Sequence, residues 1–151
     1  MKLTIFCTMP DAGILNGIIE LHKNIFGDSE GLVSKMKSKP QLLVLTAMDG
    51  EKVIGYKMGY AIDEDRFYSW MGGVATDYRK NGIASMLMEK QHGYLKEKGY
   101  KVVRTKTMNK WRSMLILNIK HGFDVIETCT DENGLLKIVL EKQLKNEGCR
   151  K

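Results

Sequence analysis

The segment from Val74 to Ser85 has the residue types of an anion-binding corner. It begins at the end of an apolar run typical of a buried strand and leads into an amphipathic run typical of a helix. The first turn of a helix carries free backbone N–H groups and a partial positive charge, so such a junction attracts phosphate. Gly82 lets the backbone approach an anion without an intervening Cβ, and Arg79 and Lys80 add mobile positive charge. The alternative is an ordinary solvated helix start.

Other chemistry is less well supported by the residue pattern. The sequence contains no G-x-x-x-x-G-K-[ST] loop, and its glycines around this corner cannot be placed as G-x-G-x-x-G. The three cysteines are widely scattered and not in metal-ligand spacing, which predicts reduced thiols and no metal site. His22 lies on the apolar side of a predicted helix and is expected to be packed. His92 and His121 have no carboxylate or thiol spaced to form a triad or a metal site.

Two short motifs resemble those of the GCN5-related N-acetyltransferase (GNAT) superfamily. The run from Arg79 to Ala84, RKNGIA, matches the family's motif A, Q/R-x-x-G-x-G/A, at every specified position. The run NIKHGF at residues 118–123 resembles the end of motif B, a helix that closes in Gly-Phe before a strand. Met114 and Asn118, four residues apart, resemble the M-x-x-x-N version of that helix.

The resemblance implies direct transfer of an acetyl group from acetyl-CoA to a primary amine of a small molecule, peptide or protein, without a metal. In the family the pyrophosphate lies on the motif A loop, and pantetheine pairs with the strand before it. Pantetheine would enter between splayed parallel strands at residues 66–75 and 100–107. The residues that the resemblance assigns to the donor are Val74, Ala75, Arg79, Lys80, Asn81, Gly82, Ile83, Ala84, Ser85, Asn109 and Asn118.

The proton-transfer groups of the family do not carry over cleanly. Tyr68 falls where the histone-acetylating members have a glutamate that serves as general base. Asn118 falls where many members have a tyrosine that serves as general acid. These two residues are the catalytic candidates, although a phenol with a reference pKa of ~10 is a poor base and an amide is a poor acid. Substitute candidates are Tyr68 and Trp70 as walls that face the substrate, with core packing as the alternative for both aromatics, and Asp63, Glu64 or Asp65 at the mouth, or a water relay. We therefore expect positioning and desolvation of the amine to dominate, with protons moving through water.

Two glycines inside the strand before the corner allow two interpretations. Gly72 and Gly73 indicate either a bulge that opens the sheet for the donor or a tight packing position beneath a helix. The acceptor itself has no sequence signature.

Hydrophobic periodicity predicts a mixed α/β (α+β) chain. A strand at 2–8 is followed by a helix entered at Asp11 and by a second helix at 29–37, which Pro40 stops. Asp49-Gly50 is a hairpin dipeptide. The remaining elements are strands at 41–48, 52–62 and 66–75, a helix at 82–98, a strand at 100–107, a helix at 112–121, and strands at 123–128 and 135–141. This order agrees with a GNAT-like fold of about four helices and a mostly antiparallel twisted sheet with one splayed parallel pair.

Length and composition predict one domain over residues 1–151. The hydrophobic share is 43%, no repeat occurs, and the longest apolar run, Leu42 to Leu45, is far too short to cross a membrane. The N-terminal segment lacks the features of a signal peptide, so a cytoplasmic location without membrane association is expected.

The charge balance leaves other functions open. Lys and Arg number 24 against 18 Asp and Glu, a net charge of +6, but the two signs are interleaved. This favours solubility over nucleic-acid binding, which ranks last. The alternative to an enzyme is a non-catalytic domain that binds acyl-CoA. A homodimer built through an exposed strand edge or the final strand is also possible.

Overall fold

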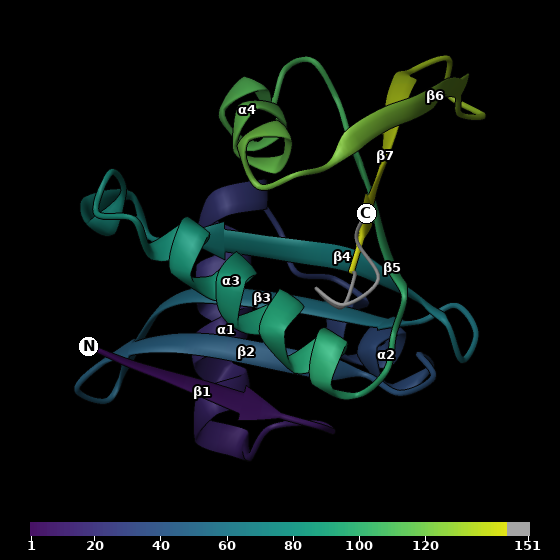
Figure 1. Ribbon diagram of the computed structural model, residues 1–151. Helices are drawn as coiled ribbons and strands as arrows, with labels where there is room; N and C mark the ends of the chain where they lie inside the picture. The colour runs from purple at the N-terminus through teal and green to yellow at the C-terminus, as the bar shows by residue number, and fades with distance from the viewer. Residues whose placement is uncertain (145–151) are drawn as a thin grey trace. The chain divides into compact units, whose positions relative to one another are not determined.

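The computed structural model describes residues 1–144, which form a seven-stranded sheet and four α-helices (Figure 1). The strand order is β1-β2-β3-β4-β5-β7-β6. The β4–β5 pair is parallel, whereas the β1–β2, β2–β3, β5–β7 and β6–β7 pairs are antiparallel. This confirms the expected mixed α/β class. The elements are β1 (Lys2–Phe6), α1 (Ala12–Phe26), α2 (Leu32–Lys37), β2 (Leu43–Asp49), β3 (Lys52–Ala61), β4 (Arg66–Val74), a 3-10 turn (Thr76–Tyr78), α3 (Ile83–Glu97), β5 (Val102–Thr107), α4 (Arg112–Lys120), β6 (Asp124–Thr130) and β7 (Leu136–Gln143).

The chain divides into two compact units. Within the described residues, the first unit contains 1–61 and 70–91, and the second unit contains 62–69 and 92–144. Both β4 and α3 pass from one unit into the other. The single domain expected from length and composition stays a prediction. Cys149 lies outside the described residues.

The first unit is a sheet with helices on both faces. In Figure 1, α1 lies behind strands β1 to β3, and the first half of α3 lies in front of them. Gly17 of α1 packs directly on Val53, because a Cβ at Gly17 would lie 2.6 Å from a methyl group of that valine. On the other face, a Cβ at Gly55 would lie 3.1 Å from Ile83 of α3. The small residues therefore let both helices approach the sheet closely.

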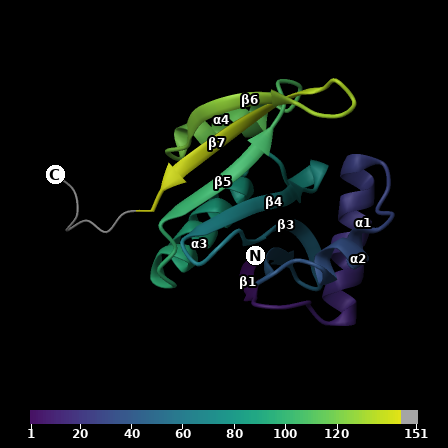
Figure 2. The same ribbon diagram turned by 90° about the vertical axis from the view of Figure 1, so that its right-hand side faces the viewer.

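The second unit contains the parallel strand pair and the C-terminal hairpin. Arg66 to Ser69 of β4 pair in parallel with Val102 to Thr105 of β5, and the ladder stops there although both strands continue. Figure 2 shows α4 behind the β6–β7 pair. Strand β6 is an edge strand, and all seven of its residues are exposed. A homodimer through this edge stays a prediction.

The structure corrects two local predictions. The second helix begins at Leu32 rather than at residue 29, because Gly31 takes a φ of 75° that a right-handed helix cannot include. The central residues of the hairpin are Gly50 and Glu51 rather than Asp49 and Gly50, because Asp49 still pairs with Lys52. Gly50 supplies the positive φ, 63°, that the tight turn requires. No helix of the described chain is long and apolar enough to cross a membrane.

A buried polar pair joins α1 to the sheet. Nδ1 of His22 and the hydroxyl of Tyr56 lie 2.6 Å apart, and both side chains are buried. His22 is thus the packed histidine that the sequence predicts. Burial lowers its pKa, so the imidazole is neutral at pH 7 and pairs with the phenol.

We expect Tyr56→Phe to lower the free energy of unfolding by about 1–3 kcal/mol, because it leaves the buried imidazole nitrogen without a partner. Urea denaturation at pH 7 measures the change. Tyr100→Phe is the matched control, since the Tyr100 hydroxyl makes no hydrogen bond within residues 1–144. Equal stability of the two variants would contradict a stabilising role for the pair.

Candidate functional site

The corner between β4 and α3 is held in place by contacts within the first unit. The N–H of Ala75 donates to the carbonyl of Ile54 at 2.8 Å, which ties the start of the corner to β3. The hydroxyl of Tyr78 donates to Oδ2 of Asp49 at 2.7 Å, which ties its middle to the β2–β3 hairpin. The backbone of the corner is therefore fixed before any ligand binds.

A run of backbone N–H groups in this corner has no protein acceptor. The N–H groups of Lys80, Asn81, Gly82, Ile83 and Ala84 donate to no group within residues 1–144. The first helical bond here runs from the N–H of Met86 to the carbonyl of Gly82. Positive φ angles at Lys80, 68°, and at Gly82, 79°, bend the chain between these amides. Successive amides with a local positive potential, at a helix start, are what an anionic oxygen requires.

Gly82 has the open surroundings that the sequence analysis expects, and it also has a positive φ. Its φ of 79° lies in the left-handed region that favours glycine, and the position of a Cβ there is open space with no atom within 4 Å. An anion can therefore approach the backbone at this residue without displacing a side chain.

Arg79 differs from the expectation of a mobile charge. Its Nε donates to the carbonyl of Val74 at 3.0 Å, and its backbone N–H donates to the carbonyl of Thr76 at 3.3 Å. Both groups therefore hold the corner together, and the run of available amides begins at Lys80. The side chain of Asn81 has a similar role, because its Nδ2 donates to the carbonyl of Tyr78 at 3.2 Å.

Gly72 and Gly73 are both positions of close packing. A Cβ at Gly72 would lie 3.0 Å from the carbonyl oxygen of Tyr56 on the neighbouring strand. A Cβ at Gly73 would lie 2.4 Å from the terminal methyl group of Ile25 in α1. Gly73 therefore lies beneath a helix, as the tight-packing interpretation expects, whereas Gly72 lies close to the neighbouring strand β3. The bulge stays a prediction.

Lys57 is a chemically distinctive residue that the sequence reasoning did not single out. It is half-buried on β3, with its Cγ 3.5 Å from where a Cβ of Gly72 would lie. Its ammonium makes no hydrogen bond or ion pair within residues 1–144. Burial lowers its pKa to about 8. The sequence did contain a signal for Lys57. It stands two residues from Gly55 and two from Gly59, so all three residues share one face of the predicted strand at 52–62.

The other predicted site residues belong to the second unit. Tyr68 is half-buried on β4 in register with Arg104 of β5. Asn109 is exposed in the connection between β5 and α4, whereas Asn118 in α4 is 3% exposed. The catalytic and donor-binding roles of these three residues stay predictions.

The substitute acid–base candidates mostly have structural contacts. Oδ1 of Asp63 accepts from the backbone N–H groups of Asp65 and Arg66, and its Oδ2 accepts from Nε of Arg66. The hydrogen bond from Arg66 lowers the pKa of Asp63 most, so this carboxylate is an ionised turn cap.

His92 is buried, with its Nδ1 2.9 Å from Nζ of Lys142. No cluster of three or more metal-ligating side chains occurs in the described chain.

The comparisons with known proteins decide the family. The model of the acetyltransferase (GNAT) family matches residues 17–113, more than half of the chain and the whole β4–α3 corner. The chain belongs to the GNAT acetyltransferase family. No curated protein matches the sequence.

Solved structures of several acetyltransferases have the same fold as this chain. An aminoglycoside 6'-N-acetyltransferase in complex with coenzyme A has a TM-score of 0.82 at 12% identity, with 97% of this chain and 99% of that chain covered. The ribosomal-protein-S18-alanine N-acetyltransferase of Escherichia coli has a TM-score of 0.76 at 14% identity, with 99% of both chains covered. A GNAT acetyltransferase of Elizabethkingia anophelis with acetyl-CoA bound has a TM-score of 0.71 at 20% identity, with 93% and 97% covered. The GNAT-like fold predicted from the sequence is confirmed.

We expect Lys57→Met to raise the free energy of unfolding at pH 7 by about 1–3 kcal/mol, because the folded protein then no longer holds a desolvated ammonium. The folded pKa of about 8 lies below the ordinary 10.5, so the unfolded chain binds more protons between these values. The free energy of unfolding of the unsubstituted protein therefore rises from pH 8 to pH 10. The difference in free energy of unfolding between the Lys57→Met variant and the unsubstituted protein becomes smaller over the same range. Urea denaturation of both proteins at pH 7 and pH 10 measures this. Lys52→Met, at an exposed position of the same strand, is the control. The same difference in free energy of unfolding at pH 7 and pH 10 would contradict the prediction.

Proposed function

We propose that this GNAT protein transfers an acetyl group from acetyl-CoA to a primary amine of a small molecule, a peptide or a protein. The observation that carries the proposal is the run of five backbone N–H groups, from Lys80 to Ala84, that lack a protein acceptor. Family membership supports the reaction type, and the two structural relatives solved with coenzyme A and acetyl-CoA support the donor.

The corner fits the diphosphate of such a donor. Five amides with no competing acceptor can donate to its oxygens, and the exposed side chain of Lys80 adds positive charge at the same place. Ser85 lies in the first turn of α3 beside this run. The strand residues Val74 and Ala75 would bind the pantetheine arm. The family resemblance also assigns Asn109 and Asn118 to donor binding, and we keep that assignment as a proposal.

The bound donor would supply an activated acyl carbon. A neutral amine attacks this carbon, the C–N bond forms, and the C–S bond then breaks. The amine loses one proton and the departing thiolate gains one. We propose that water carries these protons and that Tyr68 and Asn118 orient the reactants, because a phenol is a poor base and an amide is a poor acid at neutral pH.

The acceptor class is broad within this fold. One structural relative is named for an aminoglycoside and another for the alanine of a ribosomal protein, so the fold accommodates both small and polypeptide acceptors. For this chain, a free primary amine is the proposed common feature.

Gly82→Ala should weaken acetyl-CoA binding at least tenfold, because the left-handed φ is strained for alanine and its relaxation turns the amides away. Isothermal titration calorimetry measures the affinity. Gly99→Ala is the matched control, since Gly99 also has a positive φ, 92°, and open space around its Cβ position but lies at the other end of α3. If both variants bind acetyl-CoA as the unsubstituted protein does, the corner is not the donor site.

Tyr68→Phe and Asn118→Ala should each lower kcat/KM no more than about tenfold, the value of one hydrogen bond. Thiol release from acetyl-CoA with a panel of primary amines measures the rate. A loss of several orders of magnitude in either variant would show that the side chain itself moves a proton. Donor binding without thiol release for any amine would instead favour the non-catalytic acyl-CoA-binding domain.

A further inference from the structure

A lysine ammonium lies over two aromatic rings in the first unit. Nζ of Lys39 is 4.7 Å from the ring centroid of Tyr60 on β3 and 4.9 Å from that of Trp70 on β4. The two rings meet edge to face at 71°, with their centroids 5.9 Å apart. Both distances from the ammonium to the ring centroids lie within the range in which a ring quadrupole attracts a cation, so one ammonium interacts with two aromatic rings at once.

The backbone on both sides of Lys39 is fixed. Its own N–H donates to the carbonyl of Met36 at 3.2 Å, and the carbonyl of Pro40 accepts from the N–H of Ala61 at 3.0 Å. Ala61 is the residue after Tyr60, so the loop is tied beside the aromatic pair. Lys39 makes no ion pair with a carboxylate within residues 1–144. Within residues 1–144, the ammonium of Lys39 is therefore stabilised by the two aromatic rings and not by a carboxylate.

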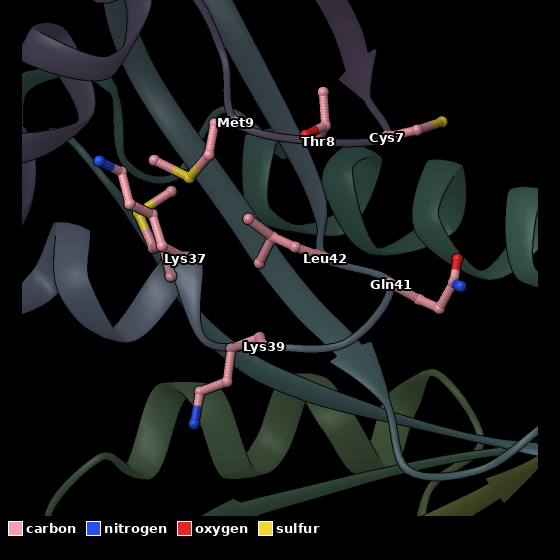
Figure 3. Close-up of a pocket in the computed structure, with 8 residues that line it drawn as sticks. Cys7, Thr8, Met9, Lys37, Lys39, Gln41 and Leu42 are labelled. Atoms are coloured by element: carbon pink, nitrogen blue, oxygen red, sulfur yellow. The ribbon is translucent and has the colours of Figure 1, made fainter.

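The ammonium of Lys39 is directed out of the neighbouring cavity. A cavity of about 220 Å³ lies between α2, the start of β2 and the segment after β1, and Lys39 is part of its lining. Figure 3 shows the side chain of Lys39 pointing away from Met9 and Leu42, which line the same cavity. The charge is thus held at the aromatic pair and not in the apolar part of the cavity.

We propose that Tyr60 and Trp70 form a binding site for an alkylammonium group and that Lys39 occupies this site until a ligand displaces it. Both rings are half-buried, so they present a preformed surface to a cation. The ε-ammonium of Lys39 is itself a primary alkylammonium, and it shows the chemistry that the two rings select.

This site lies on the strand that leads to the corner, and its role in catalysis rests on the proposed function. Trp70 precedes Val74 by four residues on β4, a span of about 13 Å along a strand. A donor arm that follows β4 from the corner would bring its acyl end toward this residue. The aromatic pair would then hold the acceptor beside the thioester.

The charge requirement narrows the acceptor class. Aromatic rings stabilise the protonated form of an amine, whereas attack on a thioester needs the neutral form. The amine held by Tyr60 and Trp70 is therefore an anchor and not the nucleophile. The acceptor class that satisfies both conditions carries at least two amino groups, one bound as an ammonium and one that reacts.

A fluorescence titration tests the binding site directly. In a Trp111→Phe background Trp70 is the sole tryptophan, since the sequence contains two. The probe is choline, and its neutral isostere 3,3-dimethylbutan-1-ol is the control ligand. We expect choline to change the Trp70 emission saturably and the alcohol not to do so. Lys39→Met should tighten choline binding roughly fivefold, because the internal cation is gone while the side-chain length is kept.

Two results would overturn the binding site. Equal response to choline and to the alcohol would show that the rings bind without regard to charge. Unchanged choline affinity in Lys39→Met would show that Lys39 does not occupy the site. Tyr60→Leu should abolish the choline response, and circular dichroism and urea midpoints establish that each variant is folded.

The acceptor role has its own measurement. With acetyl-CoA, 1,4-diaminobutane should give a kcat/KM at least tenfold above that of butylamine, and Tyr60→Leu should bring the ratio close to one. A ratio near one in the unsubstituted protein would overturn the acceptor class. Calorimetry with acetyl-CoA separates the two proposals. Choline binding without acetyl-CoA binding would contradict the donor site alone. Acetyl-CoA binding without choline binding would contradict the ammonium site alone.

Discussion

The β4–α3 corner has a run of backbone amides whose acceptors must come from outside residues 1–144. A helix cannot satisfy its own first N–H groups, and the positive φ angles at Lys80 and Gly82 leave the preceding amides without acceptors as well. Water or an anion must provide those acceptors. The other contacts of the corner, from Arg79 to Val74 and from Tyr78 to Asp49, keep the amides at fixed positions. A preformed donor set of this kind binds an anion with little reorganisation.

The same sheet supports a second, chemically different surface. Tyr60 and Trp70 come from the neighbouring strands β3 and β4, and the ammonium of Lys39 lies over both rings. Close approach of the helix layers depends on glycines, as Gly17 and Gly73 show. The corner with the amides of Lys80 to Ala84 follows β4 in the chain, and Trp70 of the aromatic pair lies on β4 itself, four residues before Val74 at the end of the strand. Under the proposed function, the corner would bind the anionic donor and the aromatic pair would bind an ammonium group of the acceptor.

Local sequence was sufficient for the order of elements and for the corner. Apolar periodicity marked the strands and helices, and Asp49-Gly50 marked the hairpin within one residue of its actual loop. The prediction of the second helix was too long because Gly31 adopts a left-handed φ that composition alone does not reveal. Arg79 was expected as a free charge, yet its Nε bonds to Val74, since the loop folds back on the strand end. Such a contact depends on loop geometry that no spacing rule specifies.

The sequence by itself determined the strand-to-helix corner, because a glycine and its flanking residues fix the backbone over a few positions. Only the tertiary structure decided the pKa of Lys57 and the pairing of Lys39 with two rings. Burial lowers the pKa of Lys57, whose Cγ lies 3.5 Å from where a Cβ of Gly72 on another strand would be. Lys39, Tyr60 and Trp70 come from three separate segments of the chain. Desolvation and ring contacts arise from neighbours that are distant in sequence, so only the assembled sheet creates them.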